Sequence, residues 1–451
     1  MKVKRTVQVS GERSAGGYDK MGRVDTEYPV DEQLVAGSRG VGDELERTSE
    51  PSSDRAALRA VTRPFWASRL LVLLLGVYAS LAVGSGGVPI TSLGRVLTAP
   101  SNHWDANWYL LIAHTGYKNP ESRAFFPLYP LLVKVGGWVI GDVYAGVVIS
   151  LVAFLVALFL LYRLVELDFG SEVARVTVAL VAFCPLAFFF SAIYTESLFL
   201  ALSVGAIYAA RRERWLIAGL VGAFAAATRS SGVLLVLPIV LLYLYGPRGD
   251  ASAPLARWHE SRSGTRLLLP RYRLSWRVWP VILVPLGLVA FTVYLALAYH
   301  AGTSWISAES YWVHQSAIPI VAYVRGMSAG WSELRHLISH SSGPYASSQH
   351  VSNLLNAIAA IVGLVVLVEC IRTLPAAYWV YAAAAFIVPL ASPVAGYPLT
   401  SFPRYELVIF PLFIGVARYL VRKRQVRIGV ASSAVLLGVF AVLFAVGNWI
   451  A

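Results

Sequence analysis

The chain has 451 residues, of which 57% are hydrophobic and only 14% are charged, and its formal net charge is +13. Its mean hydropathy is +0.61. This composition excludes a soluble globular protein and predicts a polytopic membrane protein. The basic residues interrupt apolar runs and do not form one stripe, which excludes a nucleic-acid partner and favours contact with an anionic bilayer surface.

The first part of the chain differs from the rest. Residues 1–63 alternate charged residues with Gly and Ser, and their acids and bases balance. Such a segment buries too little apolar surface to offset the entropy cost of ordering, so we expect a disordered tail followed by a membrane-integral domain over 64–451. The first apolar run begins at Leu70, which is too late for a cleaved signal peptide and predicts a signal anchor.

Apolar runs predict an all-α fold of membrane-spanning helices, each of which needs about 20 mostly apolar residues. About eleven runs reach or approach that length, and several are short. They lie at 69–90, 143–165, 176–193, 197–210, 215–228, 232–246, 278–299, 351–371, 376–393, 404–420 and 428–448.

One further apolar stretch, 124–141, sets the topology. It is broken by Pro127, Pro130 and a Gly pair, so we expect it not to span the membrane. With the tail inside, most loop cations then fall on the cytoplasmic side, as the positive-inside rule requires. Counting the stretch as a span would invert everything after it. This orientation predicts two long outer segments, 91–142 and 300–350, of which the first carries interfacial helices.

The first outer segment contains the candidate base. A helix over 103–114 would place Trp104 and Trp108 on an apolar face, with Asp105 and Tyr109 beside it. A carboxylate at headgroup depth suits a general base that acts on a hydroxyl while a lipid-linked partner stays in the bilayer. Alternatively, Asn102 is the N-cap of this helix and Asp105 completes a capping box.

Three other charged residues lie next to apolar runs and, in this orientation, on the outer side with Asp105. Glu196 is either a first-turn acid behind a Thr195 cap or a carboxylate that holds sugar hydroxyls. Arg229 either snorkels or binds an anion. Arg404 is similar, and Glu406 does not share its helix face. Carboxylates and arginines on one interface indicate a site for a phosphate-bearing lipid and a hydroxyl acceptor.

Other chemistries find little support. His336 and His340 have a spacing that permits a shared metal, but no third ligand is evident, so we expect no metal site. The two cysteines, Cys184 and Cys370, lie in or beside apolar runs and predict no disulfide framework. No glycine-rich phosphate loop follows a strand, so an activated sugar would have to arrive on a lipid.

Five blocks of the sequence resemble one known family. They are HWDANWYLLIAHTGY (103–117), AFFPLYPLL (124–132), FFFSAIYTESLF (188–199), ATRSSG (227–232) and SFPRYELVIFPLF (401–413). In this order they resemble the mannosyltransferases related to the GPI-anchor second mannosyltransferase (PIG-V) and their bacterial, mostly actinobacterial, relatives. The first and last blocks are the most specific, and the tail is not covered.

The resemblance implies a membrane-integral fold of the glycosyltransferase C type, without a cofactor. It implies an inverting mannosyltransferase that moves mannose from polyprenyl-phosphate mannose to a hydroxyl of a lipid-linked glycan or glycolipid, at the outer face of the cell membrane. Asp105 matches the catalytic aspartate. The expected substrate-binding residues are His103, Trp104, Tyr109, Tyr194, Glu196, Arg229 and Arg404. His103 stands where many relatives have another polar residue, so its contact with phosphate or sugar is the least supported.

Two other readings stay open. A transporter or flippase for a lipid-linked sugar would place ionisable residues near the membrane midplane and show repeated broken helices, whereas here the acids lie at the ends of runs. A non-catalytic accessory subunit would keep the fold with an inactive Asp105 site. The acceptor is equally open among an inositol phospholipid mannoside, a lipomannan chain, a cell-wall polymer and a protein hydroxyl.

Overall fold

The computed structural model describes residues 52–85, 92–246, 276–339 and 348–450, without the side chains of 348–351. The described residues belong to one compact unit, residues 50–451, and residues 1–49 lie outside them. Most of the expected tail therefore cannot be compared with the structure. Its expected end at residue 63 is wrong, because helix α2 begins at Asp54, behind a Ser53 cap, and buries Ala57 and Val61.

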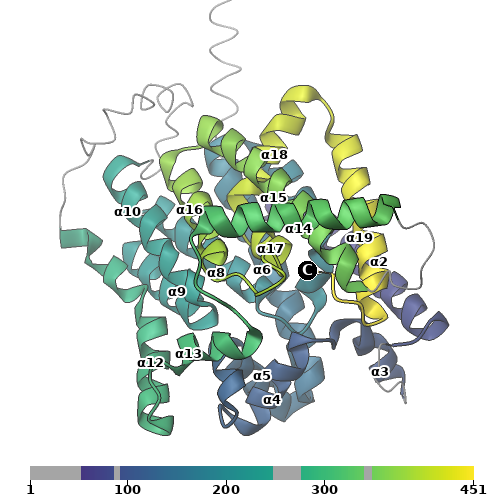
Figure 1. The fold of residues 1–451 in the computed structure, drawn as a ribbon. Coiled ribbons are helices and arrows are strands. Elements are labelled where there is room, and N and C mark those ends of the chain that lie inside the picture. The colour runs from purple at the N-terminus through teal and green to yellow at the C-terminus, as the bar shows by residue number, and fades with distance from the viewer. Residues whose placement is uncertain (1–51, 86–91, 247–275, 340–347, 451) are drawn as a thin grey trace, which may run out of the picture. The chain divides into compact units, whose positions relative to one another are not determined.

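The described residues are helical, joined by short loops, with two isolated bridges among residues 314–397 (Figure 1). The α-helices are α2 (Asp54–Ala82), α3 (Leu93–Thr98), α4 (Asp105–Thr115), α5 (Leu128–Ile140), α6 (Asp142–Phe169), α7 (Ser171–Ala182), α8 (Glu196–Arg211), α9 (Trp215–Thr228), α10 (Val236–Tyr245), α12 (Leu286–Tyr299), α13 (Ser304–Ser307), α14 (Pro319–Ser339), α15 (Ser348–Thr373), α16 (Ala376–Ile387), α17 (Phe402–Leu407), α18 (Phe410–Lys423) and α19 (Val426–Ala445). The 3-10 helices are η1 (Ala99–Ser101), η2 (Pro120–Ala124), η3 (Ala187–Ser191), η4 (Ser230–Leu235), η6 (Trp276–Leu283), η7 (Ala308–Trp312) and η8 (Val388–Ala391).

Four of the described helices are long and apolar enough to cross a membrane, and a bent pair raises the number to five. They are Asp54–Ala82, Asp142–Phe169, Ser352–Thr373, Val426–Ala445 and the pair Trp276–Leu283 with Leu286–Tyr299, bent by 40°. The protein is therefore a multi-pass membrane protein. Several other expected spans correspond to shorter apolar helices, so the number eleven stays a prediction.

The stretch 124–141 forms the short helix α5, whose 13 residues are fewer than a span needs. α5 packs against α6, and α6 packs in turn against α7 and α8. The helices at the two ends of the unit, α2 and α19, lie side by side (Figure 1). The buried core thus draws on helices from the whole membrane domain.

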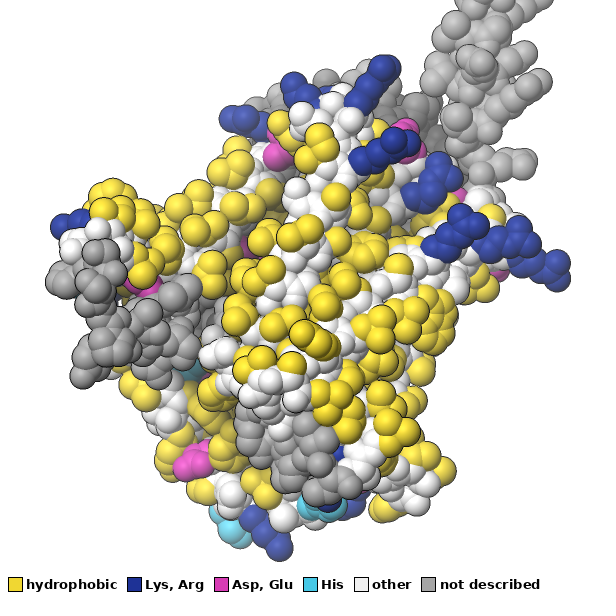
Figure 2. Space-filling view, turned by 90° about the vertical axis from the view of Figure 1, so that its right-hand side faces the viewer, with side chains coloured by type: hydrophobic (Ala, Val, Ile, Leu, Met, Phe, Trp, Pro, Cys, Tyr) yellow, Lys and Arg dark blue, Asp and Glu magenta, His cyan; other side chains and the backbone are white. Residues whose placement is uncertain are grey.

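Apolar side chains cover the middle of the face formed by these end helices, as Figure 2 shows. Exposed apolar residues of these two helices include Leu74 and Tyr78 of α2 and Val435 of α19. Lys and Arg gather at the top of the same view, the end at which α18 passes into α19. This distribution fits a lipid-facing belt bordered by cations at one membrane surface.

The break between α7 and α8 positions the first half of the site. α7 ends at Ala182, and Phe188, Phe189 and Phe190 of η3 are buried. The buried guanidinium of Arg69 on α2 donates hydrogen bonds to the carbonyls of Ala182 (3.2 Å) and Ala187 (2.8 Å). The Ala182 carbonyl lies at the end of α7, where it lacks a helical partner, and the Ala187 carbonyl lies at the start of η3, so Arg69 ties both sides of the turn that leads to Glu196 to α2.

Close packing of α9 against η6 and α12 positions the second half of the site, which contains Arg229. A Cβ on Gly219 would overlap the carbonyl of Pro280 in η6, and a Cβ on Gly287 of α12 would overlap the backbone of α9. Only glycine allows these backbones to approach so closely. The end of α9, where Arg229 follows, is therefore held against η6 and α12.

Candidate functional site

Asp105 is the first residue of α4, directly after a residue with an unusual backbone. Trp104, the N-cap, has φ 55° and ψ −113° and forms no side-chain cap. The capping box with Asn102 is therefore not formed. Instead, the Tyr194 hydroxyl donates to the carbonyl of His103 (3.0 Å) and accepts from the backbone N–H of Asp105 (3.2 Å). Tyr194 thus holds the turn that presents the Asp105 side chain.

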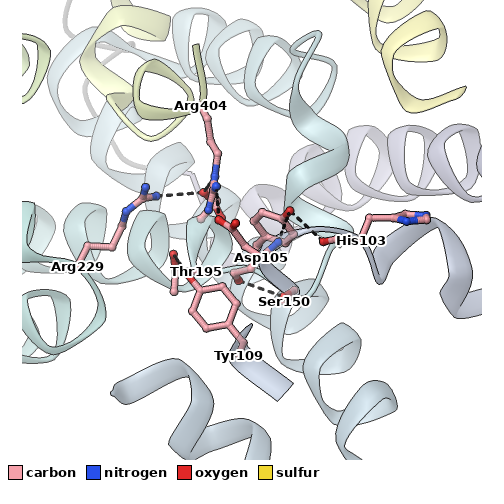
Figure 3. Close-up of polar contacts among 9 residues, drawn as sticks. His103, Asp105, Tyr109, Ser150, Thr195, Arg229 and Arg404 are labelled. Carbon is pink, nitrogen blue, oxygen red and sulfur yellow. Dashed lines mark hydrogen bonds and ion pairs between the residues drawn. The ribbon is translucent and has the colours of Figure 1, made fainter. Parts of the chain in front are cut away.

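Arg404 joins the two carboxylates of the site (Figure 3). It lies in α17, and its Nη1 is 2.5 Å from Oδ2 of Asp105, while its Nε contacts Oε1 of Glu196. The guanidinium carbon lies 4.5 Å from the ring centre of Tyr194 and 5.4 Å from that of Phe189. An arginine fork suits this bridging role, since its planar donors reach two acceptors at once.

Glu196 begins α8 and is fully buried. Glu196 is the first-turn acid expected behind Thr195, although the Thr195 side chain makes no cap hydrogen bond. Its Oε1 accepts from both arginines, with Nη1 of Arg229 at 3.1 Å. Within the described part of the chain, its Oε2 has no hydrogen-bond partner. Glu196 therefore holds the two arginines in position through its buried carboxylate and does not itself line the cavity described below.

Arg229 follows the end of α9 and turns inward. Its guanidinium carbon lies 5.4 Å from the ring centre of Tyr405 and 5.9 Å from that of Phe199. Together with its ion pair to Glu196, these contacts show that Arg229 does not snorkel to a surface. The resulting cluster of Asp105, Glu196, Arg229 and Arg404 balances two negative charges with two positive ones.

A cavity of about 730 Å³ lies over this cluster. Asp105, Arg229 and Arg404 line it, and so do the expected residues Trp104 and Tyr109. Further aromatic lining comes from Phe125, Trp305, Trp312, Tyr405 and Trp449. A concave, mostly apolar space with a few convergent charged groups is typical of a small-molecule site.

The structure does not bring every expected residue to the cavity. The His103 ring points away from the cluster in Figure 3 and packs edge-on against Phe444, with ring centres 5.6 Å apart. Burial lowers the pKa of His103, and a hydrogen bond to the Ala445 backbone partly offsets that effect. Tyr194 is fully buried beneath Arg404 and is also absent from the lining.

The cavity also has lining residues that the sequence analysis did not single out. Glu309 and His314 lie in the segment between α12 and α14, and Trp449 follows α19. Glu309 and His314 lie in the expected outer segment 300–350, and Trp449 follows the last expected span, 428–448. No local pattern marks a residue that meets others through tertiary contacts. Among the described residues no group of three His, Cys, Asp or Glu side chains could hold a metal, and His340 lies outside them.

The fold and site define a class: a multi-pass helical membrane protein in which a buried cluster of two carboxylates and two arginines underlies an aromatic cavity. Residues 82–244 match the family described as Mannosyltransferase (PIG-V). The match contains four of the five sequence blocks, so the resemblance is confirmed there and this part of the chain is PIG-V-like, whereas block 401–413 lies beyond the match. The matched part holds Asp105, Glu196 and Arg229, whereas Arg404 lies beyond it.

Curated relatives agree with this match. GPI alpha-1,6-mannosyltransferase 2 of Rattus norvegicus is 31% identical over 159 residues, which are 33% of this chain and 32% of the relative. The Homo sapiens protein of the same name is 31% identical over 147 residues, or 30% of each chain. GPI mannosyltransferase 2 of Drosophila melanogaster is 27% identical over 165 residues, 31% of this chain and 37% of the relative. The chain thus spans about a third of the length of these relatives.

Among solved structures, the apo oligosaccharyltransferase of Archaeoglobus fulgidus superposes with a TM-score of 0.43 at 12% identity. The superposition covers 85% of this chain and 56% of that one. Similarity at this level assigns neither a fold nor an activity to the chain.

Proposed function

We propose that this protein is an inverting mannosyltransferase that moves mannose from a polyprenyl-phosphate-mannose donor to a hydroxyl of a lipid-linked glycan or glycolipid. The observation that carries the proposal is the position of Arg404, whose guanidinium holds Asp105 at the cavity while a buried Glu196 fixes it from the other side. The match of residues 82–244 to the PIG-V family supports the same reaction class.

The donor phosphate binds at the two arginines. A guanidinium has five N–H donors, and the ion pairs that Arg229 and Arg404 form with the carboxylates use only part of them. Both side chains line the cavity and are mostly buried, where charge interactions are stronger than in water. They therefore stabilise the charge that develops on the departing polyprenyl phosphate.

Asp105 serves as the general base. Its side chain lines the cavity and is 21% exposed, so an acceptor hydroxyl can reach it. The acceptor oxygen forms a bond to the anomeric carbon as the bond from that carbon to the phosphate oxygen breaks. The hydroxyl proton passes to the Asp105 carboxylate, and the bonding electron pair leaves with the polyprenyl phosphate. Attack from the face opposite the phosphate inverts the anomeric carbon, and the step uses neither metal nor cofactor.

The aromatic lining supports a sugar and lipid ligand. Trp104 packs edge-on against Trp449 with ring centres 5.5 Å apart, and Tyr109 borders the same space. Apolar ring faces of this kind can contact a sugar or an isoprenoid chain while the charged cluster holds the phosphate. Tyr194 and His103 do not line the cavity; the hydrogen bond from the Tyr194 hydroxyl to the His103 carbonyl helps to fix the turn at Asp105.

The proposal includes a location. With about eleven spans in a fold of the glycosyltransferase C type, the tail is cytoplasmic and the site opens at the outer face of the cell membrane. The collection of cations at one end of the unit supports this orientation. The proposal also places the protein in the bacterial branch of the PIG-V-like proteins, as the sequence resemblance implies.

The test is sugar transfer in membranes that contain the full chain. Radiolabelled polyprenyl-phosphate mannose should label an endogenous acceptor, whereas polyprenyl-phosphate glucose and a nucleotide-linked mannose, with donor regeneration blocked, should not. Labelling from either of the last two donors, or no labelling from any, would contradict the proposed donor.

A further inference from the structure

The cavity contains a third carboxylate, Glu309, which differs from the other two. Asp105 and Glu196 each contact an arginine, whereas the ion pair found for Glu309 among the described residues is with Nδ1 of His314, 3.7 Å away. That separation exceeds a hydrogen bond, and the same Nδ1 lies 2.5 Å from the carbonyl oxygen of Ser392. The Nδ1 proton is therefore directed to Ser392, and the Glu309 oxygens retain their capacity to accept.

Glu309 is accessible from the cavity. It lines the cavity, and its side chain is 45% exposed. An ionised carboxylate accepts hydrogen bonds and cannot donate them, so the ligand group that it fits is a donor. Two oxygens on one side chain match two hydroxyl groups on neighbouring carbons of a sugar ring.

The backbone holds Glu309 in place. Val313 accepts a hydrogen bond from Ala395 N (3.0 Å), Gln315 donates to Pro393 O (2.9 Å), and His314 N donates to Glu309 O (3.2 Å). These bonds tie the segment that carries Glu309 to the segment that leads into α17 and Arg404. The position of Glu309 is thus fixed relative to the element that carries the phosphate-binding arginine.

An aromatic wall lies beside it. Trp312 packs edge-on against Trp108 and Phe125, with ring centres 5.3 Å and 5.9 Å apart, and Trp305 packs against Phe126. Trp305 and Trp312 both line the cavity together with Glu309. Aromatic faces with a carboxylate at their edge offer apolar contact to the C–H face of a sugar and hydrogen bonds to its rim.

We propose that Glu309 binds two hydroxyl groups of the acceptor sugar, so that this part of the cavity is an acceptor subsite that selects a glycoside over a protein hydroxyl. The inference rests on the proposed function, which supplies the donor and the reaction. Glu309 is then a specificity-determining residue, since a site built to bind a hydroxyl rejects a ligand that lacks it.

The experiment uses the full chain in membranes, saturating polyprenyl-phosphate mannose, and octyl α-D-mannoside with its monodeoxy analogues as acceptor probes. Glu309→Gln should raise the acceptor KM at least tenfold, with the donor KM changed less than twofold. Glu121→Gln, an exposed carboxylate outside the cavity lining, is the matched control and should leave both values unchanged. Two of the monodeoxy analogues should be poorer acceptors than octyl α-D-mannoside for the unsubstituted protein, and Glu309→Gln should raise the KM of each by a smaller factor than it raises that of octyl α-D-mannoside.

Three outcomes would overturn the inference. One is an unchanged acceptor KM in Glu309→Gln, and another is a fall in kcat alone. The third is an unsubstituted protein that transfers mannose to a peptide or an endogenous protein but to no hexoside, a result that keeps the proposed donor and reaction and changes the acceptor class. Absence of transfer to every acceptor, endogenous ones included, would instead contradict the proposed function, and the acceptor subsite with it.

Discussion

Arg404 and Glu196, which are 208 residues apart in the chain, form a buried ion pair at the base of the cavity. Glu196 also binds Arg229, and Arg404 also binds Asp105, so one carboxylate organises both arginines and, through Arg404, the proposed base. The site is therefore a single network in which each charge has a partner of opposite sign.

This network predicts that Glu196→Gln destabilises the protein. The substitution leaves two buried guanidinium groups facing a neutral amide, and loss of one partner from a buried pair costs about 3 kcal/mol or more. We expect a clear fall in the thermal unfolding midpoint of the detergent-solubilised protein. Glu369→Gln is the control, because Glu369 pairs with the mostly exposed Arg422 and should cost under about 1 kcal/mol. Equal midpoints for the two variants would contradict the role of Glu196.

Arg404→Lys should reduce transfer while retaining the positive charge. A lysine ammonium is a single point charge and cannot contact both carboxylates and a phosphate in the geometry of the guanidinium. We expect kcat at saturating donor to fall about 100-fold, the loss typical of one stabilising donor in the transition state. Arg123→Lys is the control, since Arg123 lies over the Tyr299 ring and outside the cavity lining. A kcat for Arg404→Lys within threefold of the unsubstituted protein would remove Arg404 from phosphate stabilisation.

Tyr194→Phe tests whether the hydroxyl between His103 and Asp105 positions the base. Loss of its two hydrogen bonds should cost about 1–3 kcal/mol of stability and lower kcat about tenfold, with the donor KM unchanged. Tyr129→Phe loses comparable buried bonds, to Gly146 and Ser150, without touching the turn at Asp105. We expect a similar loss of stability there but little change in kcat. If both variants lost kcat equally, Tyr194 would have no special positioning role.

His103 makes the stability dependent on pH. Burial holds its pKa below the ordinary value of 6.5, so between the two values the unfolded chain binds a proton that the folded chain does not. Stability should therefore fall as the pH drops below 6.5, with a slope of at most about 1.4 kcal/mol per pH unit from this residue. Chemical unfolding of His103→Gln between pH 5 and 7 should show a shallower slope. An unchanged slope would assign the acid sensitivity to other groups.

The sequence predicts part of this site through charge placement. One orientation, set by cations in other loops, placed Asp105, Glu196, Arg229 and Arg404 at the same membrane face, and the structure brings these four together. The sequence could not show that the Tyr194 ring packs against the Arg404 guanidinium. The two residues are far apart in the chain, and hydrophobic periodicity reports only on residues close in sequence. Glu309 was missed for the same reason.

The backbone conformation at the start of α4 could not be predicted from the sequence pattern either. A helix from His103 was expected, whereas Trp104 adopts φ 55° and α4 begins at Asp105. The reason is tertiary, since the Tyr194 hydroxyl binds the backbone on both sides of Trp104. Likewise, breaks at η3 and η4 shorten apolar runs that composition alone reads as nearly continuous.

The central claim is that Asp105 accepts the proton of the acceptor hydroxyl during mannose transfer. It is tested most directly by comparing the initial rate of labelled mannose transfer from polyprenyl-phosphate mannose for Asp105→Asn and for Asp142→Asn, at matched amounts in membranes. Asp142 pairs with His114 outside the cavity and serves as the matched substitution. The account predicts a loss of at least 100-fold for Asp105→Asn and less than a twofold change for Asp142→Asn. Transfer by Asp105→Asn at the rate of the unsubstituted protein would contradict it.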